Sequence, residues 1–302
     1  MKLSIIIVNF NTSDLLRNCV NRVYKSLNFG KIEKDSEVIV VDNASTDASV
    51  EMVEKKFPKV ILIKNEQNLG FSKANNQGIR KASGKYILLL NSDTEVDKEA
   101  LIKLVDHAEK ETSFGAMGAK ILNFDKSIQY SLGFAPTLPR VFYWMTFIDN
   151  IPNLTKFLKP YHIENSKFYT QKREVDWVSG VCILVPRKII AKIGKLDENI
   201  FMYGEEVEWC YRIKNGGLRV IYNPEVVIYH HKGSSGGGKD AGIIEEFGSL
   251  IYFYSKYRSL PHLIILKILL IFGALLRTIL FGIIVRNLEK ASIYVKAVQM
   301  VR

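Results

Sequence analysis

The sequence lacks the features of a cross-linked or exported protein. Its three cysteines, Cys19, Cys182 and Cys210, are widely spaced in 302 residues and form no CxxC pair. This disfavours a disulfide framework and a cysteine-ligated metal cluster, and it indicates a reducing compartment. The apolar run Ile5–Val8 is too short for the core of a signal peptide. We therefore expect the protein to act on the cytoplasmic side of the cell membrane.

Two common nucleotide-binding signatures are also missing. No GxGxxG motif follows the first apolar run, which excludes the usual dehydrogenase fingerprint. The segment Asn9-Phe10-Asn11-Thr12 has no glycine-rich loop followed by Arg and Lys, which argues against a nucleotidyltransferase.

Acidic residues are scarce near the C-terminus. From residue 250 to 302, eight basic residues accompany one acidic residue, Glu289, in a chain whose formal net charge is +11. The same stretch contains Leu263–Val285, which is almost wholly apolar and long enough to cross a bilayer of ~30 Å. Cations mixed with apolar runs fit an anionic membrane surface better than nucleic acid.

The position of this run relative to a membrane is open. Lys267, Arg277 and Thr278 fall within about 100° of one another on a helical wheel, which leaves a broad apolar face. This favours a helix or hairpin in the interface, with both cations reaching lipid headgroups. A true span, burdened by ~2.5–3.5 kcal/mol for each cation at the membrane centre, is an alternative. Packing against the catalytic domain is another.

Apolar runs and amphipathic segments alternate in the first third of the chain. The predicted strands are Ser4–Val8, Val38–Val41, Val60–Lys64 and Tyr86–Leu90. The predicted helices are one capped by Ser13 or Asp14, then Ala48–Lys56, a turn and helix within Asn68–Lys81, and Lys98–Lys110. Such alternation predicts an α/β fold with a mostly parallel, Rossmann-like sheet flanked by helices.

The pattern weakens between Gln129 and Lys172, where one short helix is expected near Val141–Phe147. Further on, we predict an ordered segment Val175–Pro186, helices Lys188–Ile193 and Glu205–Lys214, strands Leu218–Tyr222 and Val226–Tyr229, and a flexible loop Gly233–Gly238. We expect a catalytic domain over residues 1–240 and a basic, apolar, helical, membrane-associating region over residues 241–302.

Polar residues follow several predicted strands. Asp42, Asp93 and His230 each lie at a strand end, and ligands of open α/β sheets collect beyond the carboxyl ends of strands. Asp93 is either a helix cap or turn residue before Val96-Asp97, or a ligand of a dication that bridges two phosphates, for which one carboxylate and a histidine suffice. Asp42 is either a helix cap or an acceptor for the imide N–H of a pyrimidine. His230 is either a polar strand-edge residue or a metal ligand.

A second acidic cluster, Glu205-Glu206-Val207-Glu208, begins a predicted helix. Acidic residues complement the dipole at a helix start, but three exceed that need, and Glu206 could act as a general base. Tyr203 and Trp209 could stack on a sugar or pack in the core. These features favour a metal-assisted transferase that uses a nucleotide sugar.

The ordered set of motifs between Leu3 and Gly238 resembles the inverting glycosyltransferases of family 2, which have the GT-A fold, and especially their rhamnosyltransferase-like branch. The motifs are Ile6-Ile7-Val8-Asn9-Phe10, Val41-Asp42-Asn43-Ala44-Ser45, Asn68-Leu69-Gly70-Phe71, Leu90-Asn91-Ser92-Asp93, Val175-Asp176-Trp177-Val178-Ser179-Gly180, Phe201-Met202-Tyr203-Gly204-Glu205-Glu206 and His230-x-x-Gly233-x-Ser235. Two positions depart from the family pattern: Asn91 stands where the metal motif usually begins with Asp, and Glu206 stands where Asp is usual.

The resemblance implies a role for each group of residues. Asp42 would bind the base, Asp93 would bind Mg²⁺ or Mn²⁺, and Glu206 would deprotonate the acceptor. His230 would be a second metal ligand or a contact to the diphosphate. The implied nucleotide-sugar contacts are Asn9, Asn11, Asp42, Asn68, Gly70, Asn75, Asn91 and Asp93. The implied acceptor contacts are Trp177, Ser179, Gly180, Tyr203, Glu205 and Trp209, and Glu205 or Glu208 could share the role of base.

A single displacement would then transfer the sugar with inversion. The donor would be a dTDP- or UDP-sugar, with dTDP-rhamnose among the candidates, and the acceptor a saccharide or lipid-linked saccharide of a surface polysaccharide. The competing hypothesis is a catalytically degenerate, membrane-associated sugar-binding or scaffold protein.

Overall fold

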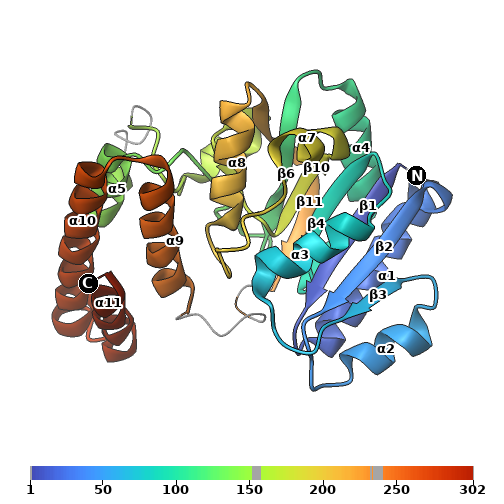
Figure 1. Ribbon diagram of the computed structural model, residues 1–302, viewed down its shortest axis with the longest axis horizontal. Helices are drawn as coiled ribbons and strands as arrows, with labels where there is room; N and C mark the ends of the chain where they lie inside the picture. The colour runs from blue at the N-terminus through green and yellow to red at the C-terminus, as the bar shows by residue number, and fades with distance from the viewer. Residues whose placement is uncertain (1, 152–157, 232, 234–240, 302) are drawn as a thin grey trace. The chain divides into compact units, whose positions relative to one another are not determined.

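The computed structural model describes residues 2–151, 158–231, 233 and 241–301 (Figure 1). The chain divides into two compact units. The first is Met1–Leu132 with Asn165–Gly236, and the second is Gly133–Glu164 with Gly237–Arg302. Sequence patterns did not predict that residues 133–164 group with the C-terminal helices. Apart from Gly233, the predicted loop Gly233–Gly238 lies outside the described residues.

The first unit is built on one large, mixed sheet. Among the described residues it has nine strands in the order β3-β2-β1-β4-β10-β6-β11-β5, with β8 paired to β11. The strands are β1 Leu3–Asn9, β2 Ser36–Asp42, β3 Ile61–Lys64, β4 Tyr86–Asn91, β5 Thr94–Val96, β6 Phe114–Leu122, β8 Arg173–Val175, β10 Cys182–Pro186 and β11 Arg219–His230. Neighbours among β1 to β4 run parallel, as do β6 and β11. Strand β10 is antiparallel to both of its neighbours. The predicted α/β class with a mostly parallel sheet is confirmed.

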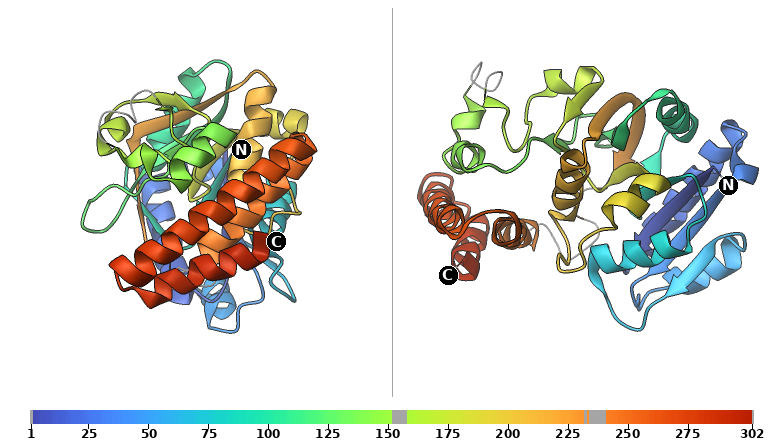
Figure 2. Two further views of the ribbon diagram at one scale, coloured as in Figure 1. Left: turned by 90° about the vertical axis from the view of Figure 1, so that its left-hand side faces the viewer. Right: turned by 45° about the horizontal axis from the view of Figure 1, so that its top comes forward.

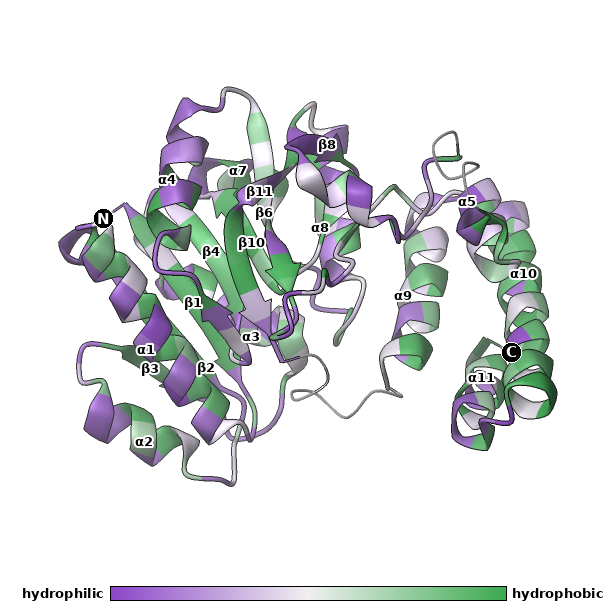
Figure 3. Ribbon diagram, turned by 180° about the vertical axis from the view of Figure 1, so that it is seen from behind, coloured by the Kyte–Doolittle hydropathy of each residue, from purple (hydrophilic) through white to green (hydrophobic). Residues whose placement is uncertain are grey.

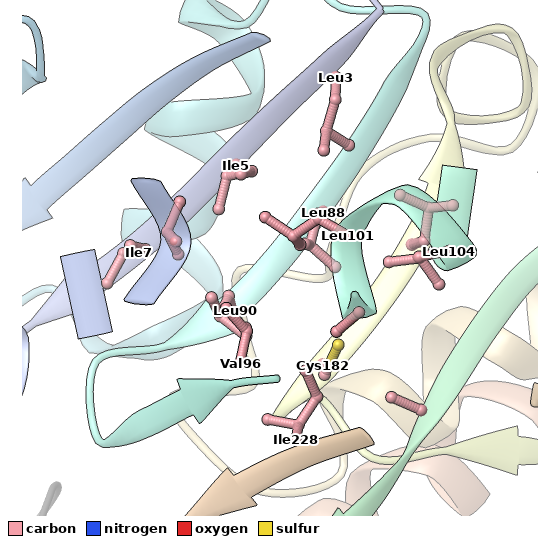
Figure 4. Packing of buried hydrophobic residues seen from close by; sticks show 14 of the residues in the cluster. Leu3, Ile5, Ile7, Leu88, Leu90, Val96, Leu101, Leu104, Cys182 and Ile228 are labelled. Atoms are coloured by element: carbon pink, nitrogen blue, oxygen red, sulfur yellow. The ribbon is translucent and has the colours of Figure 1, made fainter. Parts of the chain in front are cut away.

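Helices cover both faces of this sheet. They are α1 Ser13–Phe29, α2 Ser49–Lys56, α3 Gly70–Lys81, α4 Ala100–Lys110, α7 Arg187–Ile193 and α8 Glu205–Asn215. On one face, Leu101 and Leu104 of α4 join alternate strand residues such as Leu3 and Leu88 in the main core (Figure 4). On the other face, α3 approaches β1 so closely that a Cβ at Gly78 would lie 2.4 Å from Ile6. Figure 3 shows the largely apolar strands between these layers.

Two strands differ from the sequence prediction. Strand β6 was not predicted, because its segment Phe114–Leu122 is rich in Gly and Ala and carries little alternation. Its glycines allow close packing, since a Cβ at Gly118 would lie 2.5 Å from Val178. The predicted strands Leu218–Tyr222 and Val226–Tyr229 form the single strand β11, which passes Pro224 at a register shift between Asn223 and Val227. Proline is tolerated at such bulges, so the chain does not break there.

The predicted cap of the first helix is also wrong. Helix α1 has Thr12 at its N-cap, with no capping bond from that side chain. The backbone N–H of Ser13 instead donates to Asp47 Oδ2 at 2.9 Å, so a residue from the loop after β2 satisfies the helix start.

The second unit consists of helices. They include α5 Leu138–Met145, α9 Ala241–Tyr257, α10 Leu260–Ile279, a π-helical turn Leu280–Ile284 and α11 Leu288–Val301. Helices α10 and α11 lie side by side (Figure 2). Helix α10 also crosses α5 closely, because a Cβ at Gly273 would meet Met145 Sδ at 2.5 Å.

Of the two cations in the apolar run, Arg277 forms hydrogen bonds within the second unit. Arg277 is buried, and its guanidinium donates to the carbonyls of Met145 at 2.6 Å and Trp144 at 2.5 Å. The prediction that Arg277 reaches lipid headgroups is therefore wrong, because α5 supplies its partners. The segment Leu260–Ile284 nevertheless has the length and composition of a membrane span, with a mean hydropathy of 2.5.

Candidate active site

The polar residues predicted at strand ends meet at one edge of the sheet. The parallel register places Asn9 of β1 beside Asp42 of β2, and Val8 beside Asn91 of β4. The three strand ends therefore open into the same region, as expected for the ligand site of an α/β sheet.

Asn9 organises the Asp42 side of this region rather than facing a ligand. Asn9 is fully buried, and its Nδ2 donates to Asp42 Oδ1 and Ser45 Oγ, both at 3.0 Å. Its Oδ1 accepts from Thr12 Oγ1 at 2.6 Å. Since every polar atom of this side chain is engaged, we correct the predicted nucleotide contact of Asn9 to a positioning role. Asp42 also accepts from the backbone N–H of Ser45 at 2.9 Å, so it caps a turn and does not cap helix α2.

Asn11 lies on the exposed side of the same loop. Its backbone is left-handed, with φ of 53°, and its Oδ1 accepts from the N–H of Thr46 at 2.7 Å. The sequence did not single out Thr12, Ser45 or Thr46, because hydroxyl residues in loops are too common to signal a site.

The asparagines in and just before α3 mainly form hydrogen bonds with nearby backbone atoms. Asn68 Oδ1 accepts from the N–H of Gly70 at 2.9 Å, and Asn75 Nδ2 donates to the carbonyl of Phe71 at 3.0 Å. Gly70 has φ of +80°, and a Cβ there would lie 2.5 Å from the ring of Phe201. The glycine is thus required by close packing against Phe201 as well as by its backbone. Asn75 is buried, so its predicted nucleotide contact would need a rearrangement of this bond.

Asp93 and His230 lie together, as their strand-end positions predicted. His230 Nε2 is 3.1 Å from Asp93 Oδ1, and the N–H of His231 donates to the carbonyl of Asp93 at 2.9 Å. On the opposite side of the imidazole, His230 Nδ1 lies 2.8 Å from Gln129 Oε1. Asp93 lies in the turn between β4 and β5, as one alternative predicted, and it does not cap α4, because Asp97 Oδ1 accepts the N–H of Glu99 in the turn before that helix.

The residues at this edge fit a phosphate-bound dication better than a cation held by protein alone. Across the ranges described, no group of three or more His, Cys, Asp or Glu residues is placed to hold a metal ion. Asp93 and His230 supply two donor atoms of types that Mg²⁺ and Mn²⁺ accept, and the buried Asn91 Oδ1 has no hydrogen-bond partner in the structure. A diphosphate would have to complete such a coordination shell.

The second acidic cluster begins α8 after two left-handed residues. Tyr203 has φ of 62° and Gly204, the N-cap, has φ of 97°. Glu206 Oε2 accepts from the N–H of Gly204 at 3.1 Å, and the side chain is half-buried. Glu205 is buried, and its Oε2 has no hydrogen-bond partner in the structure. Burial, together with the charge of Glu206, raises the pKa of Glu205 well above its ordinary value.

Glu208 and Trp209 belong to the core of the unit. Glu208 is fully buried and forms a bidentate ion pair with Nε and Nη2 of Arg212. Nη1 of Arg212 donates to the carbonyl of Ile193, and Nη2 also donates to the carbonyl of Lys195. This excludes Glu208 as a shared base. Trp209 is also fully buried, and its Nε1 donates to the carbonyl of Gly194 at 2.9 Å. The predicted stacking of Trp209 on an acceptor is therefore wrong, because its ring has no free face.

The remaining acceptor-side residues connect the two acidic clusters. The N–H of Asn91 donates to the carbonyl of Val181 at 3.0 Å. A Cβ at the adjacent Gly180 would lie 3.5 Å from Glu205 Oε1, so Gly180 brings backbone close to this carboxyl. The start of α8 thus adjoins the strand-end region that holds Asn91. Ser179 donates its N–H to the carbonyl of Ser131, Trp177 is buried, and Tyr203 is partly exposed.

Comparison with known proteins is consistent with this geometry. The family model described as "Glycosyl transferase family 2" matches residues 4–192. The chain is 26% identical over 241 residues to the N-acetylglucosaminyl-diphospho-decaprenol L-rhamnosyltransferase of Mycobacterium tuberculosis, covering 74% of this chain and 75% of that protein. It is 27% identical over 223 residues to a low-salt glycan biosynthesis hexosyltransferase of Haloferax volcanii, covering 72% of this chain and 63% of that protein.

Solved structures share the fold. The mannosyltransferase PcManGT from Pyrobaculum calidifontis, in complex with GDP-Man and Mn²⁺, matches with a TM-score of 0.59 at 17% identity, over 99% of this chain and 75% of that one. TarS of S. aureus, in complex with UDP-GlcNAc, matches with a TM-score of 0.59 at 19% identity, over 100% of this chain and 82% of that one. The architecture of the sheet and its flanking helices is therefore the GT-A fold.

Proposed function

The chain belongs to glycosyl transferase family 2, and from that premise we propose that it is an inverting transferase that uses a nucleotide-diphosphate sugar. The acceptor is a hydroxyl of a saccharide or a lipid-linked saccharide. The observation that carries the proposal is the meeting of Asp42, the Asp93–His230 pair and the start of α8 at the same edge of one sheet. These are the groups needed to bind a base, hold a diphosphate and deprotonate an acceptor.

The donor side of the site favours a pyrimidine nucleotide. Asp42 is held rigidly by Asn9 and Ser45, so its carboxylate is preorganised to accept an imide N–H of uracil or thymine. Rhamnose as the transferred sugar is supported by similarity to a mycobacterial L-rhamnosyltransferase. We therefore place a dTDP-sugar, with dTDP-rhamnose first, ahead of a UDP-sugar.

Asp93 and His230 would hold Mg²⁺ or Mn²⁺ together with the donor diphosphate. A cation bound there would offset the negative charge that develops on the leaving diphosphate. The Mn²⁺ in the complex of the Pyrobaculum mannosyltransferase supports this assignment, as does the unpartnered oxygen of Asn91.

Glu206 would remove the proton of the acceptor hydroxyl as that oxygen attacks the anomeric carbon. Its backbone contact to Gly204 fixes the carboxylate at the start of α8, and the dipole of the helix favours the charged form there. The neighbouring Glu205 carries a proton over a wider pH range than an ordinary glutamate, which keeps a second negative charge away from Glu206. Attack by the acceptor opposite the leaving diphosphate inverts the configuration of the sugar.

The second unit would place the enzyme at the cytoplasmic face of a membrane. Eleven large apolar residues are exposed between the start of α10 and the start of α11, namely Leu260, Ile264, Ile265, Ile268, Phe272, Leu275, Ile279, Ile283, Ile284, Val285 and Leu288. Exposed Arg286 and Lys290 follow closely, and they would interact with anionic headgroups. A lipid-linked acceptor would be met at such a surface, in keeping with the decaprenol-linked substrate named for the mycobacterial relative.

A scaffold without catalysis is the alternative, and a donor panel tests the proposal against it. Melting temperature would be measured for the full chain in mild detergent with dTDP-, UDP- and GDP-sugars, with and without Mn²⁺. We expect stabilisation by a pyrimidine-diphosphate sugar only when the metal is present, followed by release of the diphosphate on adding acceptor. Binding without any sugar release, by hydrolysis or by transfer, would favour the scaffold.

A further inference from the structure

Gln129 lies in a loop, but both polar atoms of its side chain have hydrogen-bond partners. It is nearly buried and lies just beyond the end of β6. Its Nε2 donates to Asn123 Oδ1 and to the carbonyl of His230, both at 2.7 Å. Its Oε1 lies 2.8 Å from His230 Nδ1. The backbone N–H of Gln129 also donates to the carbonyl of Ile121 at 3.0 Å, which ties the residue to the strand.

These partners leave one orientation for the Gln129 amide. The carbonyl of His230 can only accept, so the amide atom facing it must be the NH₂ group. The oxygen Oε1 is therefore the atom that faces the imidazole. An amide oxygen can only accept, and so His230 Nδ1 must carry a hydrogen.

The loop that carries Gln129 is stabilised by hydrogen bonds between its own side chains and backbone. Asn123 Nδ2 donates to Ser127 Oγ at 2.7 Å, while the N–H and the hydroxyl of Ser127 both bond to Asp125 Oδ1. These bonds fix the Asn123 oxygen that receives Gln129, so the amide is held from both sides of the turn.

We propose that Gln129 is a positioning residue that fixes the tautomer and ring orientation of His230 and so presents Nε2, on the Asp93 side, to the divalent cation. The inference rests on the proposed metal site at Asp93 and His230. Histidines that bind metals usually donate their second ring N–H to a neighbouring acceptor, and loss of that acceptor typically weakens metal binding by about 10–100-fold.

The test compares three variants with the parent protein. Gln129→Met removes the acceptor at similar length, and Gln129→Glu restores an acceptor for Nδ1–H. Gln171→Met is the matched control, since Gln171 is exposed and its Oε1 accepts from Arg173. Imidazole ¹⁵N spectra of histidine-labelled, metal-free protein report the tautomer, with the His230 signals assigned by His230→Gln. Mn²⁺ binding in the presence of dTDP is measured by electron paramagnetic resonance.

In the parent and in Gln171→Met, we expect Nδ1 of His230 to be protonated in the spectra. In Gln129→Met we expect mixed tautomers and a loss of Mn²⁺ affinity of about 10–100-fold. Gln129→Glu should restore the affinity only in part, because it returns the acceptor for Nδ1–H but not the donor to Asn123 and the carbonyl of His230. Unchanged spectra and Mn²⁺ affinity in Gln129→Met, with weakened binding in His230→Gln, would overturn the role of Gln129 and leave the metal site standing. If Mn²⁺ binding were unaffected in His230→Gln as well, the metal site itself would be wrong, and this inference would fall with it.

Discussion

At the scale of single residues, the two acidic motifs are held in ways that suit different steps. Asp93 contacts a histidine, whereas Glu206 contacts a backbone N–H at a helix start. We predict that Glu206→Gln lowers the turnover number by at least ~100-fold, the lower range for loss of a general base, with donor binding unchanged. Asp93→Ala should abolish transfer and also remove metal-dependent stabilisation by the donor. Steady-state transfer assays and melting temperatures with donor and Mn²⁺ measure the two effects.

The control for these variants is Asp14→Ala, which removes an exposed carboxylate from the start of α1. It should behave as the parent protein in both assays. Full transfer activity in Glu206→Gln would show that another group accepts the proton, and Glu205 would then be the first candidate. Normal metal-dependent donor binding in Asp93→Ala would remove Asp93 from the site.

Glu205 gives a prediction about pH. Burial raises the pKa of Glu205 in the folded state, so the folded protein holds a proton that the unfolded chain releases above ~4.3, the ordinary pKa of glutamate. The associated stability is complete below that pH and is lost as the pH rises through the folded-state pKa. Gln at this position does not titrate. The melting temperature of Glu205→Gln should therefore increase relative to the parent between pH 5 and pH 8.

Melting curves at several pH values for the parent, Glu205→Gln and Glu198→Gln test this, because Glu198 lies in the same unit with a partly exposed side chain. A constant difference between the parent and Glu205→Gln at all pH values would mean that Glu205 is ionised in the folded protein.

The residues that meet at the site could be predicted from the sequence. The role of each residue could be predicted less well. Asp42, Asp93 and His230 were predicted because strand ends can be recognised from apolar runs, and parallel strands end together. The burial of Asn9 and Trp209 depends on partners 33 and 15 residues away, which spacing does not reveal. The role of Gln129 could not be predicted from the sequence, since its contact with His230 spans 101 residues and its own segment has no periodicity.

At the scale of elements, α8 is anchored by an ion pair in its interior. Glu208 is fully buried and Arg212 is largely so, and Arg212 also donates to two carbonyls, one at the end of α7 and one in the loop after it. Glu208→Ala would leave the guanidinium without its carboxylate partner in a buried setting. We predict a loss of ~3–5 kcal/mol in the free energy of unfolding, as for other broken buried pairs. Urea unfolding of the protein, followed by fluorescence, would measure this.

A matched surface pair provides the control for that prediction. Glu99 and Lys103 form an exposed ion pair with the same i,i+4 spacing at the start of α4, so Glu99→Ala should lower the free energy of unfolding far less than Glu208→Ala. Equal losses in the two variants would mean that α8 is not stabilised by its buried pair.

The elements themselves were predictable where apolar periodicity was strong. Strands β1 to β4 and the helices between them follow from runs such as Ile5–Val8 and Tyr86–Leu90. Strand β6 was not predicted because its segment is rich in Gly and Ala, which do not show the alternation of a strand. Its glycines pack closely against Val178 and Ile213. Pro224 suggested a break in β11, but a bulge accommodates it without ending the strand.

At the scale of the whole molecule, the chain combines a GT-A unit with a helical unit whose surface is apolar and basic. The main core of the GT-A unit is formed by residues of that unit (Figure 4). The apolar residues exposed on α10 are instead costly in water, and burial in a lipid interface would stabilise them. Association with a membrane would also raise the local concentration of a lipid-linked acceptor.

The double variant Ile268→Ser with Phe272→Ser tests this association. Both side chains are exposed on α10, at 59% and 52%, so their loss should not disturb the helical core. Insertion of an Ile or Phe side chain into an apolar phase contributes ~1.5–3 kcal/mol, so the variant should bind anionic vesicles at least ~100-fold more weakly. Phe29→Ser is the matched control, because Phe29 is 50% exposed but lies in the GT-A unit. Co-sedimentation with vesicles of mixed zwitterionic and anionic lipid measures the binding. If the double variant and Phe29→Ser bound vesicles equally well, α10 would not be the membrane-contacting element, and its apolar face would have to be covered by protein.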